Sequence, residues 1–537
     1  MSSAAHQLLA TAHLKGPHID FAGLSPQIAL LGGAVLVLVV GLAPWRRARS
    51  QLVPALTLVA LGAALGLTIW QWNSHKSIVS GALRVDDLSL ALNIFLLAGG
   101  AASVLLGGRS LSAREAGHGE WSALLLSSIG GMSLLAAAQN TVALFLGLEL
   151  LSIPLYVLCA SELRREHSLE SGLKYLIVGS VGSATLLYGV AMLYGATGQT
   201  DFAGIAHALS RGGLASDPLT LTGIALCVAG LCFKASVAPF HQWTPDVYEG
   251  APTPVTAFMT VATKVAALGA LLRLFDVALL PAHGSWAGAV AVLATITIVV
   301  GNVGALGQSS LKRLLAYSSV AQAGYMLAGV VVASRLGVQA TVFYLGVYLA
   351  MNMAAFAVIV ARERATGLGD SIDAIAGLGR VRPALAWPMT ISMLALAGIP
   401  ATAGFTGKFY LIDAAVSGGY AWLGVVIVIG SMISLGYYLP VIAAMWMRPA
   451  VAGVTPAGGL PAQPLPRLAG GSREADGQPA PAPARAPASG RVADALGAQP
   501  EIALVAALAG VATIFFGIVP QPLFDLVNGA GRALGLH

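Results

Sequence analysis

One acidic and three basic residues stand inside otherwise apolar stretches of this sequence, namely Glu149, Lys234, Lys264 and Lys408. A charged side chain near the centre of a bilayer costs at least ~2.5–3.5 kcal/mol, so such a residue persists where it is paired, hydrated or used. Burial favours the neutral amine of a lysine, whereas a nearby carboxylate favours its ammonium form. A Glu–Lys pair that opens and closes can therefore take up and release a proton. The set predicts proton transfer through the interior of a membrane protein.

The choice of lysine supports this interpretation. A lysine ammonium can lose its proton, whereas an arginine guanidinium effectively cannot. All three cations inside apolar stretches are lysines, although arginine dominates the polar segments of the chain. The alternative is that the four charged residues form static salt bridges that hold helices together.

Several uncharged or titratable side chains close to these positions could extend a proton path. His241 follows Lys234 by seven positions, and its imidazole could relay protons, although a hydrogen-bonded histidine at a helix break is the alternative. Tyr317, Ser318, Ser319 and Gln322 could order water between the charged sites. Hydroxyl groups in membrane helices also bond to the backbone, so each of these residues alone is a weak signal.

The elements that position these residues follow from composition. Hydrophobic residues make up 57% of the 537 residues and charged residues 10%, against about 25% charged in a soluble domain. Apolar stretches of roughly 20 residues recur, and each can cross a bilayer core of about 30 Å as a helix. Strand-type alternation is absent, so we expect no strands and no β-barrel. The chain is predicted to be an all-α polytopic membrane protein.

Fourteen transmembrane helices are expected. Their approximate ranges are 24–43, 52–70, 88–107, 121–138, 141–160, 173–195, 219–240, 255–275, 286–306, 314–334, 338–361, 384–413, 420–446 and 501–519. The seventh and twelfth are expected to be broken, since Pro239 and Gly398-Ile399-Pro400 interrupt them. In transporters such breaks recur at matching places in two structural repeats and mark the ion site.

These helices divide the chain into five regions. They are an N-terminal region of residues 1–120 with helices one to three, a first five-helix repeat 121–275, a second repeat 286–446, a linker 449–500 and a C-terminal region of residues 501–537 with helix fourteen. The linker is rich in Pro, Ala, Gly and Arg, which predicts a disordered insertion. A segment that docks a partner is the alternative for it.

Most of the 29 lysines and arginines fall in segments that share one side if the N-terminus lies outside. This bias satisfies the positive-inside rule with both termini on the outer side of the membrane. The formal charge of +6 is therefore a topology signal, and binding of nucleic acid is not expected. We expect the acidic residues Asp86, Asp87, Asp246 and Glu249 at the membrane interface.

Other kinds of site find no support in the sequence. Cys159, Cys227 and Cys232 lie in apolar segments without any CxxC pair, which predicts small buried side chains and no metal, iron–sulfur or disulfide site. No glycine-rich phosphate loop follows a strand, and no cluster has the spacing of metal ligands. No redox chemistry is expected in this chain itself.

The stretch from Phe233 to Val255 reads F-K-x4-P-F-H-x-W-x-P-D-x3-G-A-P-T-P-V. It resembles the signature of the antiporter-like proton-translocation proteins, which comprise subunits L, M and N of NADH–quinone oxidoreductase (respiratory complex I) and the large Mrp-type antiporter subunits. Four strings resemble the subunit N branch: ESGLKY at 170–175, PDVYEG at 245–250, LKRLLAYSS at 311–319 and the segment 397–409.

The resemblance implies a core of fourteen helices with two inverted five-helix repeats, in which quinone reduction elsewhere in the complex drives protons through this chain. It places the key residues of the family on Glu149, Lys234, Lys264 and Lys408. Relatives often carry a histidine where this chain has Gln322. Subunit M and an Mrp-type cation–proton antiporter subunit remain alternatives.

The resemblance also implies the surroundings of the chain. No cofactor is expected in it, because NADH, FMN, Fe–S clusters and quinone would belong to partner subunits. The expected partners are membrane subunits of the M, K, J, L, A and H types in a bacterial cytoplasmic membrane. The chain would then be a non-redox subunit of a proton-translocating enzyme.

Overall fold

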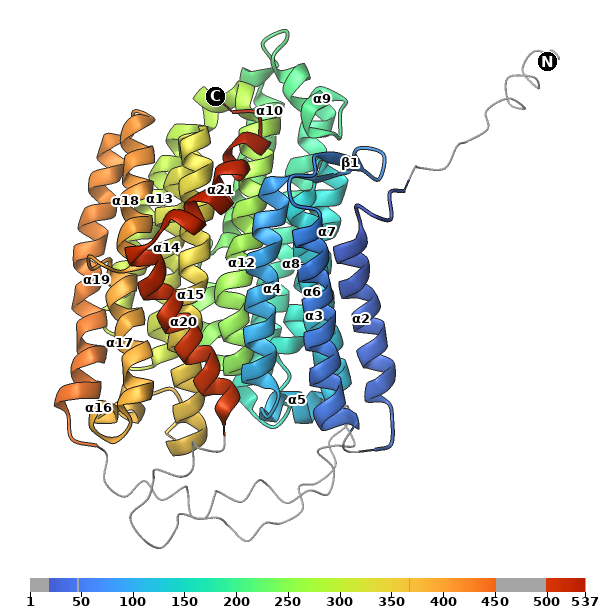
Figure 1. The fold of residues 1–537 in the computed structure, drawn as a ribbon. Coiled ribbons are helices and arrows are strands. Elements are labelled where there is room, and N and C mark those ends of the chain that lie inside the picture. The colour runs from blue at the N-terminus through green and yellow to red at the C-terminus, as the bar shows by residue number, and fades with distance from the viewer. Residues whose placement is uncertain (1–18, 46–47, 367, 451–498, 537) are drawn as a thin grey trace, which may run out of the picture.

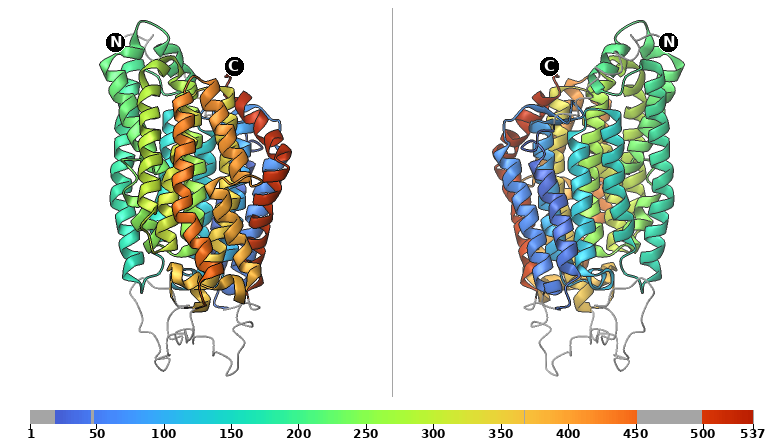
Figure 2. Two further views of the ribbon diagram at one scale, coloured as in Figure 1. Left: turned by 90° about the vertical axis from the view of Figure 1, so that its left-hand side faces the viewer. Right: turned by 90° about the vertical axis from the view of Figure 1, so that its right-hand side faces the viewer.

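The computed structural model describes residues 19–45, 48–366, 368–450 and 499–536. They form a bundle of long helices whose axes are roughly aligned (Figures 1 and 2). Twelve helical segments of the described chain are long and apolar enough to cross a membrane, and two further apolar helices are shorter. Each of the fourteen predicted ranges falls on helix. The prediction of an all-α membrane protein is therefore confirmed, while the division into domains and repeats stays a prediction.

The N-terminal region contains the elements before the first predicted repeat. They are α2 (Ser25–Gly41), the short turn η1 (Ala48–Leu52), α3 (Val53–Trp70), β1 (Lys76–Ile78), β2 (Leu83–Val85), α4 (Asp87–Gly107) and α5 (Leu111–Ala116).

The region of the first predicted repeat is built from ten elements. They are α6 (His118–Ala137), α7 (Thr141–Cys159), α8 (Glu166–Thr197), α9 (Phe202–Leu209), η2 (Leu214–Ser216), α10 (Pro218–Ala235), α11 (Trp243–Gly250), α12 (Thr253–Arg273), η3 (Leu274–Ala278) and η4 (Leu280–Ala282).

The region of the second predicted repeat and the C-terminal region complete the bundle. Their elements are α13 (His283–Ala305), α14 (Leu311–Val331), α15 (Arg335–Thr366), η5 (Ile372–Ile375), α16 (Leu378–Val381), α17 (Pro383–Ala397), α18 (Ala403–Ser417), α19 (Ala421–Met447), α20 (Pro500–Ile518) and α21 (Gln521–Ala533). Most of the predicted linker 449–500 lies outside the described residues.

Two faces of the bundle carry the connections (Figure 1). We call the face with β1, α9 and α21 the outer face, and the face with α5 and α16 the inner face, after the predicted orientation. The expectation of no strands is wrong, because β1 and β2 form a small antiparallel hairpin with Lys76 opposite Val85. Strands of three residues are too short to show the alternation that reveals a strand in a sequence.

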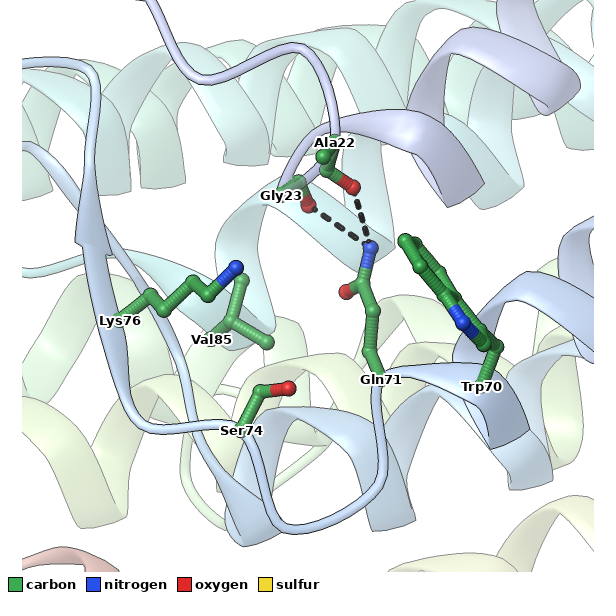
Figure 3. A pocket seen from close by; sticks show the side chains of 7 residues that line it. All are labelled: Ala22, Gly23, Trp70, Gln71, Ser74, Lys76 and Val85. Atoms are coloured by element: carbon green, nitrogen blue, oxygen red, sulfur yellow. Dashed lines mark hydrogen bonds between the residues drawn. The ribbon is translucent and has the colours of Figure 1, made fainter.

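The outer ends of the first two helices are joined by a glutamine. Gln71, just after α3, donates through Nε2 to the carbonyl oxygens of Ala22 at 2.6 Å and Gly23 at 3.4 Å (Figure 3). The same nitrogen lies 3.0 Å from the Ser25 hydroxyl at the start of α2. This side chain therefore fixes the beginning of the described chain to the bundle.

Both predicted helix breaks are confirmed. The seventh range ends as a helix at Ala235, because Ser236 adopts a left-handed conformation with φ of 64°, and α11 begins at Trp243. The twelfth range stops at Ala397, where Gly398 has φ of 87°, and α18 begins after Thr402. Glycine adopts this backbone without steric cost. Each break leaves carbonyl groups at membrane depth without helical partners.

The central helices are enclosed by the others. The most apolar windows of α12, α14 and α15 are buried over 89% or more of their length, whereas those of α3, α8, α19 and α20 are buried over 33% or less. Charged or polar groups on the central helices thus face protein and not lipid. Lys264 lies on α12, the most enclosed helix of the described chain.

A buried ion pair joins three helices near the outer face. Arg273 at the end of α12 donates to both carboxylate oxygens of Asp86, at 2.6 and 3.1 Å, and to the Ala136 carbonyl of α6 at 2.5 Å. Asp86 also caps α4 by accepting from the Ser89 amide at 2.9 Å. We expected Asp86 at the membrane interface, but its side chain and that of Arg273 are fully buried within the protein.

We predict that Asp86→Ala lowers the stability of the purified protein by about 3–5 kcal/mol, because it leaves the Arg273 guanidinium buried without a counter-charge. The measurement is the thermal unfolding midpoint in detergent. Arg84→Ala is the control, since Arg84 is 45% exposed and 3.7 Å from Asp86, and exposed pairs contribute less than about 1 kcal/mol. Equal midpoints for the two variants would contradict the structural role of the pair.

Candidate functional site

Lys234 occupies the last turn of α10, directly before the first helix break. Its side chain is 1% exposed, and its ammonium donates to the Ser152 hydroxyl at 2.7 Å and the Tyr175 hydroxyl at 2.9 Å. The nitrogen also lies 5.0 Å from the centre of the Tyr175 ring, within the range of a cation–π contact. Neutral hydroxyl groups therefore hold this lysine, and no carboxylate contacts it directly in the described chain.

Glu149 stands one helical turn before Ser152 on α7. Its charge acts on the Lys234 ammonium, but the two groups form no salt bridge within the 4 Å limit. One of its carboxylate oxygens, Oε1, is buried without a hydrogen-bond partner among the described residues. The predicted Glu–Lys pair thus stands open in this structure, and Lys234 instead donates to Ser152, one helical turn after Glu149.

Glycines fix the helix that carries Glu149. A Cβ atom on Gly131 of α6 would clash with the Leu151 amide nitrogen, and one on Gly147 of α7 would lie 2.9 Å from the Leu135 nitrogen. Real Cβ atoms do not approach other atoms so closely, so α6 and α7 contact each other through their backbones. Glu149 is therefore held on a closely packed helix pair.

Lys264 lies at the middle of α12 and its side chain is fully buried. Its ammonium nitrogen has no hydrogen-bond partner among the protein groups of the described chain. The Thr260 hydroxyl, one turn earlier, donates to the Thr256 carbonyl at 2.7 Å, and the Thr263 hydroxyl donates to the Met259 carbonyl. A lysine in such surroundings gains little from staying charged.

Further polar atoms that lack partners within the described protein lie on the helices around α12. They are the hydroxyl oxygens of Tyr248, Ser319 and Tyr348 and Oδ1 of Asn352. Ser319 is close to both tyrosine hydroxyls. Buried polar groups are normally satisfied by protein or by ordered water. We therefore expect ordered water among these groups, as the sequence suggested for Ser319.

Lys408 in α18 binds the end of the preceding half-helix. Its ammonium donates to the carbonyl oxygens of Leu396 at 2.8 Å and Ala397 at 3.1 Å, the last residues of α17. It also lies 4.9 Å from the centre of the Tyr325 ring. The carbonyl end of a helix carries partial negative charge, which favours a cation there. The break in the twelfth helix thus supplies the acceptors for this lysine.

A chain of polar side chains leads from Lys408 to α14 and α19. The Leu396 carbonyl also accepts from Nε2 of Gln322 at 3.3 Å, and Oε1 of Gln322 accepts from the Tyr344 hydroxyl at 2.5 Å. The Tyr438 hydroxyl lies 3.5 Å from Nε2 of Gln322 and 2.5 Å from the Ser318 hydroxyl. Gln322 therefore joins the Lys408 group, where its amide bonds but does not titrate.

The remaining predicted residues are placed less centrally. The Tyr317 ring packs against Gly304 and joins no described hydrogen bond of the network. His241 is half-buried in the break after α10, and its Nδ1 has no partner within the described protein. Among the described residues, no salt bridge joins any two of Glu149, Lys234, Lys264 and Lys408. The interpretation of the four as static salt bridges finds no support in this geometry.

Sequence reasoning missed several polar residues that contact these lysines or their neighbours, namely Ser152, Tyr175, Tyr344 and Tyr438. Ser152 had a usable signal, because it lies three positions after Glu149 and so on the same helix face. The tyrosines had none, since each comes from a helix distant in the sequence. The expected burial of the three cysteines is confirmed.

A polar pocket of about 450 Å³ opens at the inner face. It contains Asp246, which accepts from Lys174 of α8 at 2.9 Å and from Arg313 of α14 at 2.8 Å, while Arg313 also binds Glu249 at 2.8 Å. Burial alone raises the pKa of Asp246, but the hydrogen bonds from Lys174 and Arg313 outweigh it and lower that pKa. Asp246 and Glu249 thus line a pocket that opens at the inner face, and their position at the membrane interface stays a prediction.

The sequence profile of the family described as "NADH:quinone oxidoreductase/Mrp antiporter, TM" matches residues 138–434. A relative named NADH-quinone oxidoreductase subunit N, from Trichlorobacter lovleyi, is 43% identical over 73% of this chain and 81% of its own length. A second of the same name, from Salinispora arenicola, is 38% identical over 97% of this chain and 99% of its own.

Two solved structures are similar in fold. A chain of respiratory complex I from Thermus thermophilus with bound aureothin is 32% identical, with a TM-score of 0.73 over 94% of this chain and 100% of that chain. A chain of the Mrp complex from Dietzia sp. is 23% identical, with a TM-score of 0.80 over 96% and 97%.

We predict that a map of this protein at a resolution sufficient for water will show ordered water that bridges Tyr248, Ser319 and Tyr348. The packing of Cys159 against Met259, whose sulfur atoms lie 3.2 Å apart, is the internal control. This contact is equally buried but apolar and is expected to be dry. Absence of water from both places would contradict a hydrated interior around α12.

Proposed function

The chain belongs to the NADH:quinone oxidoreductase/Mrp antiporter family and within it to subunit N of NADH-quinone oxidoreductase, a proton-translocating membrane subunit, and on this basis we propose that Glu149, Lys234, Lys264 and Lys408 carry the protons. The proposal rests on one observation above all. Three fully or almost fully buried lysines lie on separate helices, and none of them is in a salt bridge within the described chain.

This arrangement suits proton transfer better than it suits stability. A buried ion pair holds its proton firmly, because loss of one charge leaves the other uncompensated. Lys234, Lys264 and Lys408 instead contact hydroxyl or carbonyl groups or no described protein group, and such surroundings do not fix an ammonium with a counter-charge. Each amine can therefore change its protonation state when the charge of a neighbour changes.

We propose the order Glu149 and Lys234, then Lys264, then Lys408. Lys234 and Glu149 lie on α10 and α7, Lys264 on the central α12, and Lys408 on α18. Polar side chains lie between these sites, with Tyr248, Ser319 and Tyr348 around α12 and the Gln322 group at Lys408. His241 stays a candidate relay and Tyr317 a weaker one.

The surroundings of the chain belong to the same proposal. The chain acts as a non-redox subunit, and NADH, FMN, Fe–S clusters and quinone act in partner subunits, including those of the M, K, J, L, A and H types. It lies in a bacterial cytoplasmic membrane with both termini on the outer side. This orientation is supported by the excess of lysine and arginine in the inner-face segments.

The Mrp-type cation–proton antiporter and subunit M are the competing functions. Identities near 40% to relatives named subunit N favour that subunit, whereas the similarity to the Mrp chain concerns the fold alone. A sodium-dependent proton flux through the isolated subunit in vesicles would favour the antiporter instead.

We predict that Lys234→Met lowers NADH-driven proton pumping several-fold in inverted membrane vesicles, because the variant removes the titrating amine and keeps the apolar stem. Assembly of the complex is checked separately by native gel electrophoresis. Lys76→Met is the matched control, since Lys76 is 56% exposed on the outer face. Full pumping by an assembled Lys234→Met complex would leave a purely structural scaffold as the better explanation.

We predict that Glu149→Gln weakens pumping more than it weakens assembly. The amide keeps the shape of the carboxylate but carries no charge that could stabilise the Lys234 ammonium. The measurement is the ratio of protons translocated to NADH oxidised in vesicles with equal amounts of assembled complex. A lower amount of complex with an unchanged ratio would count against the proposed role.

A further inference from the structure

The turn between α11 and α12 is held from two sides by ionisable groups, the buried Lys312 and the partly buried Glu363. Lys312 of α14 donates from its ammonium to the Ala251 carbonyl at 2.8 Å, and Glu363 of α15 accepts from the Thr253 hydroxyl at 2.7 Å. Ala251 directly follows α11, and Thr253 begins α12. Neither Lys312 nor Glu363 belongs to the proton path described above.

Lys312 is as deeply buried as the lysines of that path. Its side chain is 1% exposed, and the Ala251 carbonyl is its single hydrogen-bond partner in the described chain. The charge of Lys312 acts on the Glu363 carboxylate, but the two form no salt bridge within 4 Å. This open Lys–Glu arrangement is like that of Lys234 and Glu149.

The charge of each group is unfavourable for the helix dipole at its end of the helix. Lys312 is the second residue of α14, where the helix dipole disfavours a cation, and Glu363 lies in the last turn of α15, where it disfavours an anion. A pair chosen for stability would have the opposite placement. The helix ends therefore push both groups towards their neutral forms.

The inner pocket reaches the same place. Gly250 and Arg313 line its wall, and they are the chain neighbours of Ala251 and Lys312. The pocket of about 450 Å³ thus ends one residue from each partner of the Lys312–Ala251 hydrogen bond. The pocket therefore approaches the Lys312–Ala251 contact through the chain neighbours of both residues.

The other end of α11 leads to Lys234. Trp243, the first residue of α11, donates from Nε1 to the Phe233 carbonyl at 3.1 Å and stacks on the Tyr175 ring with 4.6 Å between centres. Tyr175 in turn binds the Lys234 ammonium. An eight-residue helix spans about 12 Å. The half-helix α11 therefore connects the Lys312 contact with the Lys234 site.

We propose that Lys312 and Glu363 form a proton-loading site that supplies Lys234 from the inner pocket, an inference that rests on the proposed function. A proton from water in the pocket binds the neutral Lys312 amine and gives the ammonium. The ammonium then loses this proton and becomes an amine again, and the neutral Lys234 amine finally accepts the proton. While Lys312 holds the proton, the Glu363 carboxylate stabilises its ammonium. When the proton moves to Glu363, both groups are neutral.

The test compares Lys312→Arg with Lys312→Met in the assembled complex, with NADH-driven pumping by inverted vesicles as the readout. Arginine keeps the charge and can bond to the Ala251 carbonyl, but it cannot release its proton. A loading site therefore loses pumping several-fold in both variants, while NADH oxidation by a water-soluble acceptor stays at the wild-type level. Wild-type pumping by Lys312→Arg would overturn the proposal, since a structural contact alone would then suffice.

Glu363→Gln keeps the test decisive if the larger arginine prevents assembly. Glutamine is isosteric, and its carbonyl oxygen still accepts from Thr253, so a structural role survives and proton exchange does not. Loss of pumping supports the proposal, and full pumping overturns it. Lys76→Met is again the control. If Lys234→Met loses pumping while the Lys312 and Glu363 variants keep it, only this inference fails; if all of them keep it, the proposed function fails as well.

Discussion

The cost of an uncompensated charge in a low-dielectric interior governs this structure. The protein meets it with oriented neutral groups, since Lys234 binds two hydroxyls and Lys408 binds two carbonyls. Where a permanent charge is needed, as for Arg273, the chain instead supplies a bidentate carboxylate. The contrast separates two uses of a buried cation. The arginine is fixed by a full counter-charge, whereas Lys234 and Lys408 bind neutral groups only.

The broken helices follow from the same constraint. An unbroken helix uses its carbonyl groups internally, so it offers none to a cation at membrane depth. The end of α17 at Ala397 frees the acceptors that Lys408 binds. The end of α10 places Lys234 in a last turn, where the helix dipole favours its charge. The interruptions are therefore the means by which an apolar bundle accommodates ammonium groups.

Much of this could be predicted from the sequence, because the cost of charge in hydrocarbon depends on residue type alone. The helices, both breaks and the burial of Lys234, Lys264 and Lys408 followed from apolar length, proline or glycine, and isolated charge. The contacts of Tyr175 and Tyr438 did not, because they depend on which helices pack together. The burial of Lys312 and Arg273 was missed for a related reason. Both lie at helix ends, where a sequence gives no sign of whether protein or water surrounds the side chain.

The close packing of α6 on α7 has a mechanical consequence. With Gly131 and Gly147 at backbone contact, a side chain added at either position would force α7 away from α6. Glu149 is carried by this closely packed helix, so in the proposed relay its carboxylate is the fixed member of the Glu149–Lys234 pair. In the proposed relay, opening and closing of the pair then depends on the four-carbon stem of Lys234, whose ammonium reaches Ser152 and Tyr175 in this structure.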